Sequence, residues 1–223
     1  MEYKYELHCH TKYGSRQCGR TEPKEIAKLY KEAGYSGVVI TDHYSPLTFN
    51  LTHGHFNPKK FIHEYINPYY EMKKYEDENF SVMFGMELRH YGTGNDYLIY
   101  GVDPEWLREQ GNLLKLLEKD AYKLMHSQGY LVFQAHPFRP YITRCNPKYI
   151  DGIEIYNGKV PKSSNDKAEK WANETHKLIS SGSDFHVPKH LARGGIITEK
   201  PIKNNADLLE TLKSKDFKVI KTY

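Results

Sequence analysis

Two pairs of residues in the sequence each place two metal-ligating side chains two positions apart. His8 and His10 form one pair, and Asp184 and His186 form the other. On an extended segment, residues i and i+2 point to the same side, so each pair can hold one cation. Imidazole and carboxylate ligands without thiolates suit zinc, manganese or iron better than calcium. Either pair taken alone has an equally good structural explanation.

Ligand-type residues also follow short apolar runs that are typical of strands. Five residues stand at the end of such a run: His8, His43, Glu87, His136 and Asp184. In a parallel barrel, the carboxyl ends of the strands converge on one face, where active sites are built. The pattern therefore predicts that these five side chains share one metal centre, together with His10 and His186.

The rest of the chain alternates strand-like runs with amphipathic stretches typical of helices. We expect strands at residues 3–7, 37–41, 80–85, 97–100, 130–134, 152–156, 179–183 and 195–198. We expect helices at about residues 21–34, 58–75, 104–127, 165–178 and 205–214. This alternation indicates an α/β fold with a parallel sheet, closed or distorted into a barrel. Without an internal repeat or a Gly/Ser linker, residues 1–223 are predicted to form a single domain.

Composition restricts the class of protein. The 223 residues are 39% hydrophobic and 27% charged, as in soluble globular proteins. No apolar run approaches the roughly 20 residues that span a bilayer, and the first residues lack the pattern of a signal peptide, so we expect a cytoplasmic protein without a membrane span. The three cysteines form no C-x-x-C unit, which argues against a thiolate zinc site. The net charge of +4 is dispersed, so nucleic acid is not expected as a partner.

Six short motifs carry these residues in a fixed order along nearly the whole chain. They are Glu-Leu-His-Cys-His-Thr at 6–11, Thr-Asp-His at 41–43, Gly-Met-Glu at 85–87, Ala-His-Pro at 135–137, Gly-Ile-Glu-Ile-Tyr-Asn at 152–157 and Gly-Ser-Asp-Phe-His at 182–186. The set resembles the PHP (polymerase and histidinol phosphatase) family. The resemblance implies a distorted seven-stranded (β/α) barrel, similar to a TIM barrel, with a two- or three-metal phosphoesterase site.

The resemblance also implies how the ligands are shared. It assigns four ligands to a first metal: His8, His10, Glu87 and Asp184. Glu87 would bridge to a second metal that His136 also holds, and His43 and His186 would hold a third. The expected cofactors are therefore two or three divalent ions of zinc, manganese or iron. Asp42 would orient a ligating imidazole, unless it is a solvent-facing loop residue.

Two positions depart from the family pattern. Gln17 stands where an acid usually completes the third metal site, although the neighbouring Cys18 could coordinate as a thiolate. The second metal often has another histidine between Glu87 and His136. The candidates for that ligand are His90, Asn95 and Asp96, and the sequence does not choose among them.

Residues that bind the substrate have weaker signatures. Arg139, Arg16 and Arg193 are candidates for binding a phosphate with a planar guanidinium, although arginine is more often a solvated surface residue. Glu154 and Asn157 lie at a strand end, where barrel packing explains them at least as well as catalysis. The pair His53 and His55 lies in a loop with no strand before it, which favours a lid or a surface feature.

The sequence therefore predicts a phosphoesterase that hydrolyses a small phosphorylated metabolite with metal-activated water. His43 or His186 would supply the proton for the leaving group if the third metal is absent. The alternatives are a nuclease or proofreading phosphodiesterase, a phosphotyrosine phosphatase of the capsule-associated type, and a non-catalytic metal-binding scaffold. The substrate, the metal and the oligomeric state are left open.

Overall fold

The computed structural model describes residues 2–54 and 56–223. Over these residues the strands are β1 (Tyr3–Cys9), β2 (Gly37–Ile40), β3 (His43–Tyr44), β4 (Ser81–Leu88), β5 (Tyr97–Tyr100), β6 (Leu131–Gln134), β7 (Gly152–Asn157), β8 (Leu178–Gly182), β9 (Gly194–Thr198) and β10 (Lys218–Lys221). The eight expected strands are present, and β3 and β10 are additional. Strand β4 is longer than expected, so Glu87 lies inside the strand and not after it.

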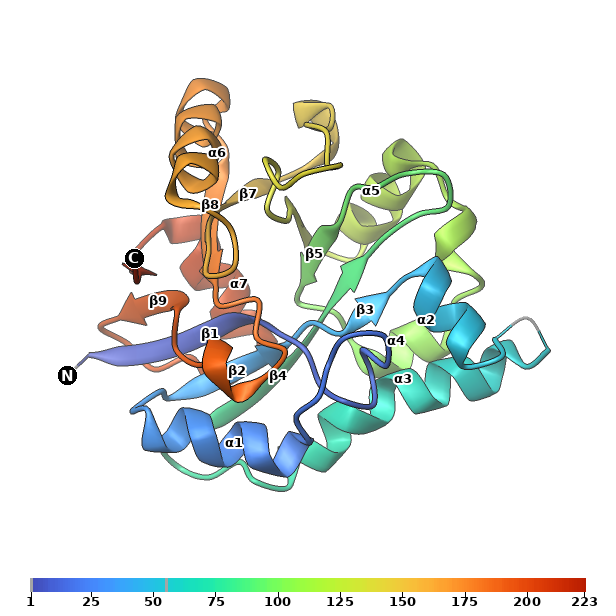
Figure 1. Ribbon diagram of the computed structural model, residues 1–223, viewed down its shortest axis with the longest axis horizontal. Coiled ribbons are helices and arrows are strands. Elements are labelled where there is room, and N and C mark those ends of the chain that lie inside the picture. Colours follow the sequence, from blue (N-terminus) through green and yellow to red (C-terminus); the bar gives the residue numbers. More distant parts are fainter. Residues whose placement is uncertain (1, 55) are drawn as a thin grey trace.

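The helices are α1 (Pro23–Glu32), α2 (Pro46–Leu51), α3 (Pro58–Lys73), α4 (Pro104–Glu109), α5 (Glu118–Ser127), α6 (Lys162–Thr175) and α7 (Asn205–Ser214). The single helix expected over 104–127 is wrong, because the chain leaves the helix at Gln110 and Asn112 caps a short 3-10 turn before α5 begins. Figure 1 shows α1, α3, α5 and α6 arranged around the outside of the strands. None of the helices in the described part of the chain is long and apolar enough to cross a membrane.

The seven-stranded (β/α) barrel expected from the sequence is wrong. The described strands form one ten-stranded mixed sheet in the order β10-β9-β1-β2-β4-β5-β6-β7-β8, with β3 paired to β4. Strand β5 runs antiparallel to both β4 and β6, and β9 runs antiparallel to β1. For β4 and β5 the cause is the length of their connection. Residues 89–96 are too few for the helical crossover that a parallel pair requires.

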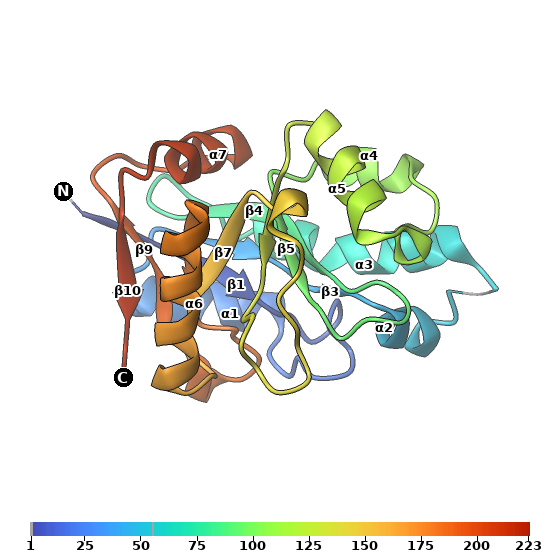
Figure 2. The ribbon, with the colours of Figure 1, turned by 90° about the horizontal axis from the view of Figure 1, so that it is seen from above.

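The sheet curls until its ends approach each other. Beyond β8, the backbone of Phe185 exchanges two hydrogen bonds with β1, from His10 N to Phe185 O at 2.9 Å and from Phe185 N to His8 O at 3.0 Å. Tyr100 of β5 reaches across the interior and donates to the carbonyl of Leu7 in β1 at 3.2 Å. Figure 2, viewed from above, shows α6 and α7 on different sides of this curled sheet. The curl brings the carboxyl ends of β1, β4, β6 and β8 to one region.

Hydrophobic packing holds this curl in place. Leu7, Leu98 and Phe133, from three different strands, belong to one buried cluster. The same cluster contains Leu208 and Leu212 of α7, so this helix covers one side of the strand core. Outside the sheet, Ile26 and Tyr30 of α1 pack against Val38 and Ile40 of β2. Strands β2 and β4 are buried along their whole length, as expected for strands covered on both faces.

The closure between β8 and β1 leads to a test of the fold. A Cβ atom at Gly182 would lie 2.2 Å from Cβ of His8, so Gly182→Ala must push the two strands apart. We expect the free energy of unfolding to fall by about 1–3 kcal/mol, measured by chemical denaturation. Gly111→Ala is the matched control, since no described atom lies within 4 Å of its Cβ position. Equal stability of the two variants would contradict the described closure.

Candidate metal centre

The seven residues predicted to bind metal lie together at the carboxyl ends of the strands. His8 and His10 come from β1 and the residue after it, Glu87 comes from β4, and His136 follows β6. Strand β3 pairs His43 directly with Glu87. The remaining two, Asp184 and His186, lie on the segment that pairs with β1. The seven side chains are between 0% and 13% exposed.

Glu87 lies at the centre of this group. Its Oε1 atom lies 3.4 Å from His8 Nε2 and 3.0 Å from His136 Nε2. Its Oε2 atom lies 3.4 Å from His10 Nε2 and 2.6 Å from His43 Nδ1. The two carboxylate oxygens therefore face different imidazoles, which is the arrangement that a bridging carboxylate requires.

Asp184, in the segment that follows β8, approaches the same group. Its Oδ1 atom lies 3.7 Å from His8 Nε2 and 3.4 Å from His10 Nε2. The ligand atoms of His8, His10 and Asp184 all lie within 4.8 Å of one another, as do those of His8, Glu87 and His136. Two overlapping sets of ligands are thus in place, and His8 belongs to both.

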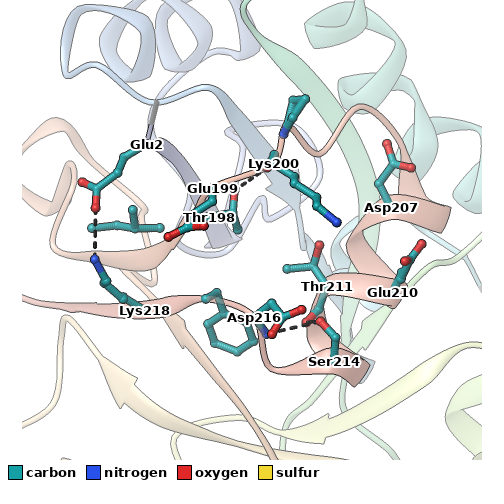
Figure 3. Close-up of a pocket in the computed structure, with 13 residues that line it drawn as sticks. Glu2, Thr198, Glu199, Lys200, Asp207, Glu210, Thr211, Ser214, Asp216 and Lys218 are labelled. Atoms are coloured by element: carbon teal, nitrogen blue, oxygen red, sulfur yellow. Dashed lines mark hydrogen bonds and ion pairs between the residues drawn. The ribbon is translucent and has the colours of Figure 1, made fainter.

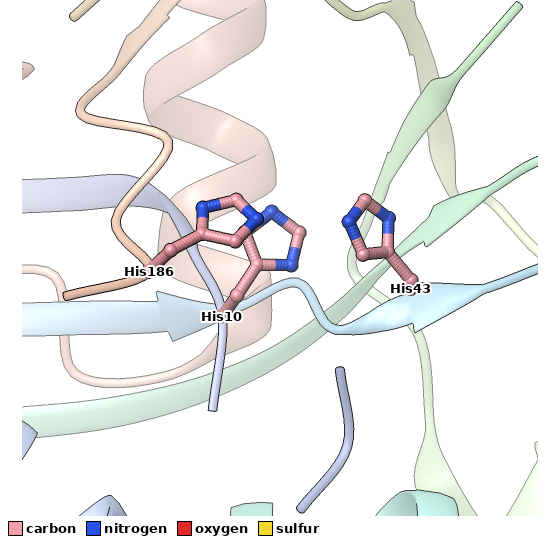
Figure 4. Close-up of side chains that lie close together, drawn as sticks. All are labelled: His10, His43 and His186. Carbon is pink, nitrogen blue, oxygen red and sulfur yellow. The ribbon is translucent and has the colours of Figure 1, made fainter. Parts of the chain in front are cut away.

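A third set consists of imidazoles alone. The possible ligand atoms of His10, His43 and His186 also lie within 4.8 Å of one another. The ring of His10 lies near both of the others, with centroid distances of 4.3 Å to His43 and 4.2 Å to His186. Figure 4 shows the three side chains directed toward one another from separate segments.

Several buried polar atoms in the centre have no hydrogen-bond partner within the described residues, among them His8 Nε2, His10 Nε2 and Asp184 Oδ2. Burial of an unpaired polar atom costs about 1–3 kcal/mol. Imidazole nitrogens and carboxylate oxygens that point at one another at 3–4 Å have the chemistry of a divalent cation site. The residues present therefore fit bound metal ions.

Hydrogen bonds behind the cluster fix which nitrogen of each imidazole faces inward. His8 Nδ1 lies 2.7 Å from Glu154 Oε1, and His10 Nδ1 lies 2.9 Å from Ser15 Oγ. Since the Ser15 hydroxyl donates its one proton to Asp42 Oδ1 at 2.7 Å, it must accept from His10. In both rings Nδ1 then carries a proton, and Nε2 is the nitrogen that faces the cluster. This is the ring orientation that a metal ligand needs, and a bound cation would displace any proton on Nε2.

Glu154 and Asp42 thus act behind the ligand-type residues. Glu154 also accepts from the backbone N–H of His136 at 2.8 Å, so one carboxylate orients two imidazoles. Asp42 reaches the cluster through Ser15 and not by direct contact with an imidazole. Burial raises the pKa of Asp42 to about 6, although hydrogen bonds from Ser15 and Thr11 oppose the rise. The sequence did not decide the role of either acid, and it did not identify Ser15 as part of the site.

The electrostatics of the centre favour ionised carboxylates. Burial alone would raise the pKa of Glu87, but the charges of His43 and His8 hold it well below its usual value. The pKa of Asp184 is lowered in the same way, since His8 and His10 outweigh its burial. Burial also lowers the pKa of His186, to about 4, so this ring is neutral at pH 7. Ionised carboxylates and a neutral imidazole are the forms that bind cations.

Two residues of the centre adopt backbone conformations that are uncommon for residues with side chains. His136 has φ of 29° and Asp184 has φ of 51°. Such left-handed positions cost of order 1–3 kcal/mol and cluster at functional sites. Here each one turns a side chain inward directly after a strand.

The loop after His10 lacks an acid that faces the cluster. The side chain of Gln17 turns to Thr48, whose hydroxyl donates to Gln17 Oε1 at 2.9 Å. The neighbouring Cys18 is half-buried. Burial alone would lower the pKa of His43, but Glu87 and then Cys18 raise it well above its usual value. The third set of ligands therefore receives no carboxylate from this loop.

Asp96 is the candidate that approaches His136. Its Oδ2 atom lies 3.9 Å from His136 Nε2, and its carboxylate accepts from Arg89 Nε at 2.6 Å and from Arg89 Nη2. Asn95 instead accepts from the backbone of Thr143 at 3.0 Å. His90 packs near Tyr97, with ring centroids 5.9 Å apart. Tertiary structure thus distinguishes three residues that the sequence could not.

The three predicted substrate arginines lie in different environments. Arg139 Nη1 lies 4.0 Å from Asp184 Oδ2, so this residue does reach the centre. Arg16 is paired with Glu64 of α3 at 2.7 Å, and Arg193 donates to the carbonyl of Gly158 at 3.3 Å. Lys159, which the sequence analysis missed, lies closer than any of them, with Nζ 3.4 Å from Asp184 Oδ2. No spacing rule identifies it, because it lies in a loop two residues beyond β7.

His55 is not among the described residues, so the predicted pair with His53 has no structural description. An open groove of about 560 Å³ lies between α7 and strands β9 and β10, and its lining residues include Thr198, Thr211 and Lys218 (Figure 3). None of the predicted site residues lines it.

Comparison with known proteins gives a partial match in sequence and an extensive match in structure. A family model described as PHP-associated matches residues 162–217, the segment that contains Asp184 and His186. No curated protein sequence matches the chain.

Solved structures are similar along nearly the whole chain. A two-domain protein from Bacteroides vulgatus that contains a predicted PHP-like metal-dependent phosphoesterase has a TM-score of 0.67 at 16% identity, over 99% of this chain and 65% of that one. PsfC from Pseudomonas syringae has a TM-score of 0.70 at 13% identity, over 99% and 92% of the two chains. The lesion-specific endonuclease PfuEndoQ from Pyrococcus furiosus has a TM-score of 0.69 at 16% identity, over 98% and 58%.

At these identities the structural similarity establishes the fold. The chain spans less than two thirds of the Bacteroides and Pyrococcus proteins. Together, the family match over residues 162–217 and the fold shared with a PHP-like protein confirm the resemblance of this chain to the PHP family.

Proposed function

We propose that the protein is a metal-dependent phosphoesterase that hydrolyses a small phosphomonoester. The observation that carries the proposal is the central carboxylate of Glu87, which faces four imidazoles with two oxygens. Paired cations a few ångströms apart are the usual device for hydrolysing phosphate esters. The fold shared with a PHP-like protein supports the same chemistry.

Five side chains would hold a pair of metal ions, and His43 and His186 would either hold a third ion or transfer a proton. We assign His8, His10, Glu87 and Asp184 to the first ion, and Glu87 and His136 to the second, with Asp96 nearby. Divalent ions bound there would polarise the phosphoryl oxygens and lower the pKa of a bound water. The imidazole-rich ligand set favours zinc, manganese or iron.

The chain's own residues would orient and hold the substrate. Arg139 and Lys159 approach Asp184 Oδ2 from the solvent side, and Arg89 lies beyond Asp96. Cations around a buried acidic centre would attract an anionic ester and restrict how it enters. His43, at 13% exposure, is the most accessible imidazole of the seven and is available to contact the leaving group.

A phosphodiesterase acting on nucleic acid is the second candidate. PfuEndoQ, a lesion-specific endonuclease, shares the fold with a TM-score of 0.69. Against this candidate, the net charge of only +4 is dispersed along the chain. Release of nucleotides from single-stranded or abasic DNA by the purified protein would favour it over the monoesterase.

Metal content and activity test the proposal directly. Treatment with a chelator should abolish hydrolysis of p-nitrophenyl phosphate, and added zinc or manganese should restore it. Removal of the metal by the chelator should also lower the melting temperature. A ligand at 100 times its dissociation constant stabilises the folded state by about 2.7 kcal/mol, and this stabilisation would be lost. Elemental analysis should find at least two ions per chain. A protein that holds no metal and hydrolyses no phosphoester would support a non-catalytic scaffold instead.

Glu154→Gln tests the orientation of the imidazoles. The variant keeps the size of the side chain but loses the carboxylate that serves both His8 and His136, so we expect metal affinity to fall roughly 10- to 100-fold. Isothermal titration with zinc or manganese measures the effect. Glu174→Gln, on the exposed face of α6, is the matched control. Unchanged affinity in Glu154→Gln would contradict an orienting role.

His43→Ala distinguishes two roles for the third set of imidazoles. If His43 and His186 bind an ion, the variant should contain fewer ions per chain than the wild type. If His43 instead transfers a proton, its metal content should stay unchanged while the rate of hydrolysis falls by about 10²- to 10⁴-fold. The exposed His126→Ala should change neither quantity.

A further inference from the structure

The loop that follows β7 holds a lysine in an unusual position. The backbone N–H of Lys159 donates to Asn157 Oδ1 at 2.9 Å, and Gly158 N donates to the carbonyl of Gly182 at 2.9 Å. A Cβ atom at Gly158 would lie 2.6 Å from Arg193 Cβ, so only glycine permits this close approach. The loop is therefore held against β8, and the backbone position of Lys159 is well defined.

The ammonium of Lys159 has few of its donors satisfied. Its Nζ lies 3.2 Å from His186 Nδ1, but that nitrogen also lies 2.8 Å from the carbonyl oxygen of Asp184. A carbonyl only accepts, so His186 Nδ1 must carry a proton and cannot accept one from Lys159. Within the described part of the chain, this leaves Asp184 Oδ2, at 3.4 Å, as its anionic partner. That distance exceeds the 2.7–2.9 Å or so of a charge-assisted hydrogen bond.

A second cation approaches the same oxygen. Arg139 Nη1 lies 4.0 Å from Asp184 Oδ2, and the Arg139 side chain is 43% exposed. The Lys159 side chain is 23% exposed, so both cations face the solvent side of the cluster. A lysine and an arginine therefore converge on one carboxylate oxygen that makes no hydrogen bond with the described residues. Between them, they have several donors free for an incoming anion.

We propose that Lys159, with Arg139, binds the phosphoryl group of the substrate and selects a phosphomonoester over a phosphodiester. The inference rests on the proposed phosphoesterase function. A monoester carries close to two negative charges at neutral pH, whereas a diester carries one. Two cations at one edge of the centre therefore stabilise the monoester more.

Lys159→Met tests this assignment, because it removes the charge and keeps an unbranched side chain. We expect kcat/KM for p-nitrophenyl phosphate to fall by about tenfold or more, in line with the loss of one charged hydrogen bond. The value for bis-p-nitrophenyl phosphate should change much less. Titration of the metal-loaded protein with inorganic phosphate should show a comparable loss of affinity, with unchanged metal content. Lys159→Arg should recover part of both losses.

Lys167→Met is the matched control, since Lys167 is exposed on α6 and its replacement changes the net charge equally. An equal loss for both esters, or unchanged phosphate affinity in Lys159→Met, would overturn the proposal. If the wild type hydrolyses neither ester, the proposed function fails, and the phosphate titration still decides whether Lys159 binds the anion. Thermal denaturation of each variant verifies that it is folded.

Discussion

The position of the Glu87 carboxylate is the constraint on which the centre depends. An ionised carboxylate that is fully buried is costly unless charges or ligands compensate for it. Four imidazoles surround it, and two of them, on His8 and His43, carry the charges that lower its pKa despite burial. The same four rings would otherwise crowd one another without a common partner. Carboxylate and imidazoles therefore require each other, and bound cations would satisfy the nitrogens that still lack partners.

Two strand pairings bring these groups together. Strand β3 has only two residues, yet its parallel pairing with β4 sets His43 beside Glu87. The segment after β8 pairs with β1, which brings Asp184 to His8 and His10. A regular barrel of alternating strands and helices is not needed for this. What the centre needs is a curl tight enough for strands distant in sequence to meet.

Around the ligands, a layer of hydrogen bonds converts flexible rings into fixed ones. Glu154 holds His8 and the backbone of His136, while Asp42 acts on His10 through Ser15. These acids are as buried as the ligands themselves. They differ from the ligands in what they contact: Glu154 contacts the outer nitrogen of His8 and the backbone of His136, and Asp42 contacts Ser15. The cations Lys159 and Arg139 then lie on the Asp184 side of the centre, where both are partly exposed.

By itself, the sequence determined which ligand-type side chains lie together. H-x-H and D-x-H spacing identified four of the seven side chains, because residues two apart on an extended segment point to the same side. The apolar runs before His43, Glu87 and His136 identified the other three. The eight expected strands were predicted from apolar runs, which are a local property of the sequence. The sheet order did not follow, and the expected distorted seven-stranded barrel was wrong. Strand β5 is antiparallel because its connection to β4 is too short for a crossover, and β9 pairs antiparallel with β1, which is distant in sequence.

Only the tertiary structure decided among residues without a local pattern. His90, Asn95 and Asp96 are indistinguishable as neighbours in sequence, but only Asp96 faces His136, since the turn between β4 and β5 directs each side chain differently. Arg16 was a candidate phosphate ligand in the sequence, but in the structure it forms an ion pair with Glu64 of α3. Lys159 carries no signal in the sequence, because its relation to Asp184 depends on two loops that meet only when β7 and β8 pair. Contacts between distant segments are properties of the fold, and periodicity along the chain does not encode them.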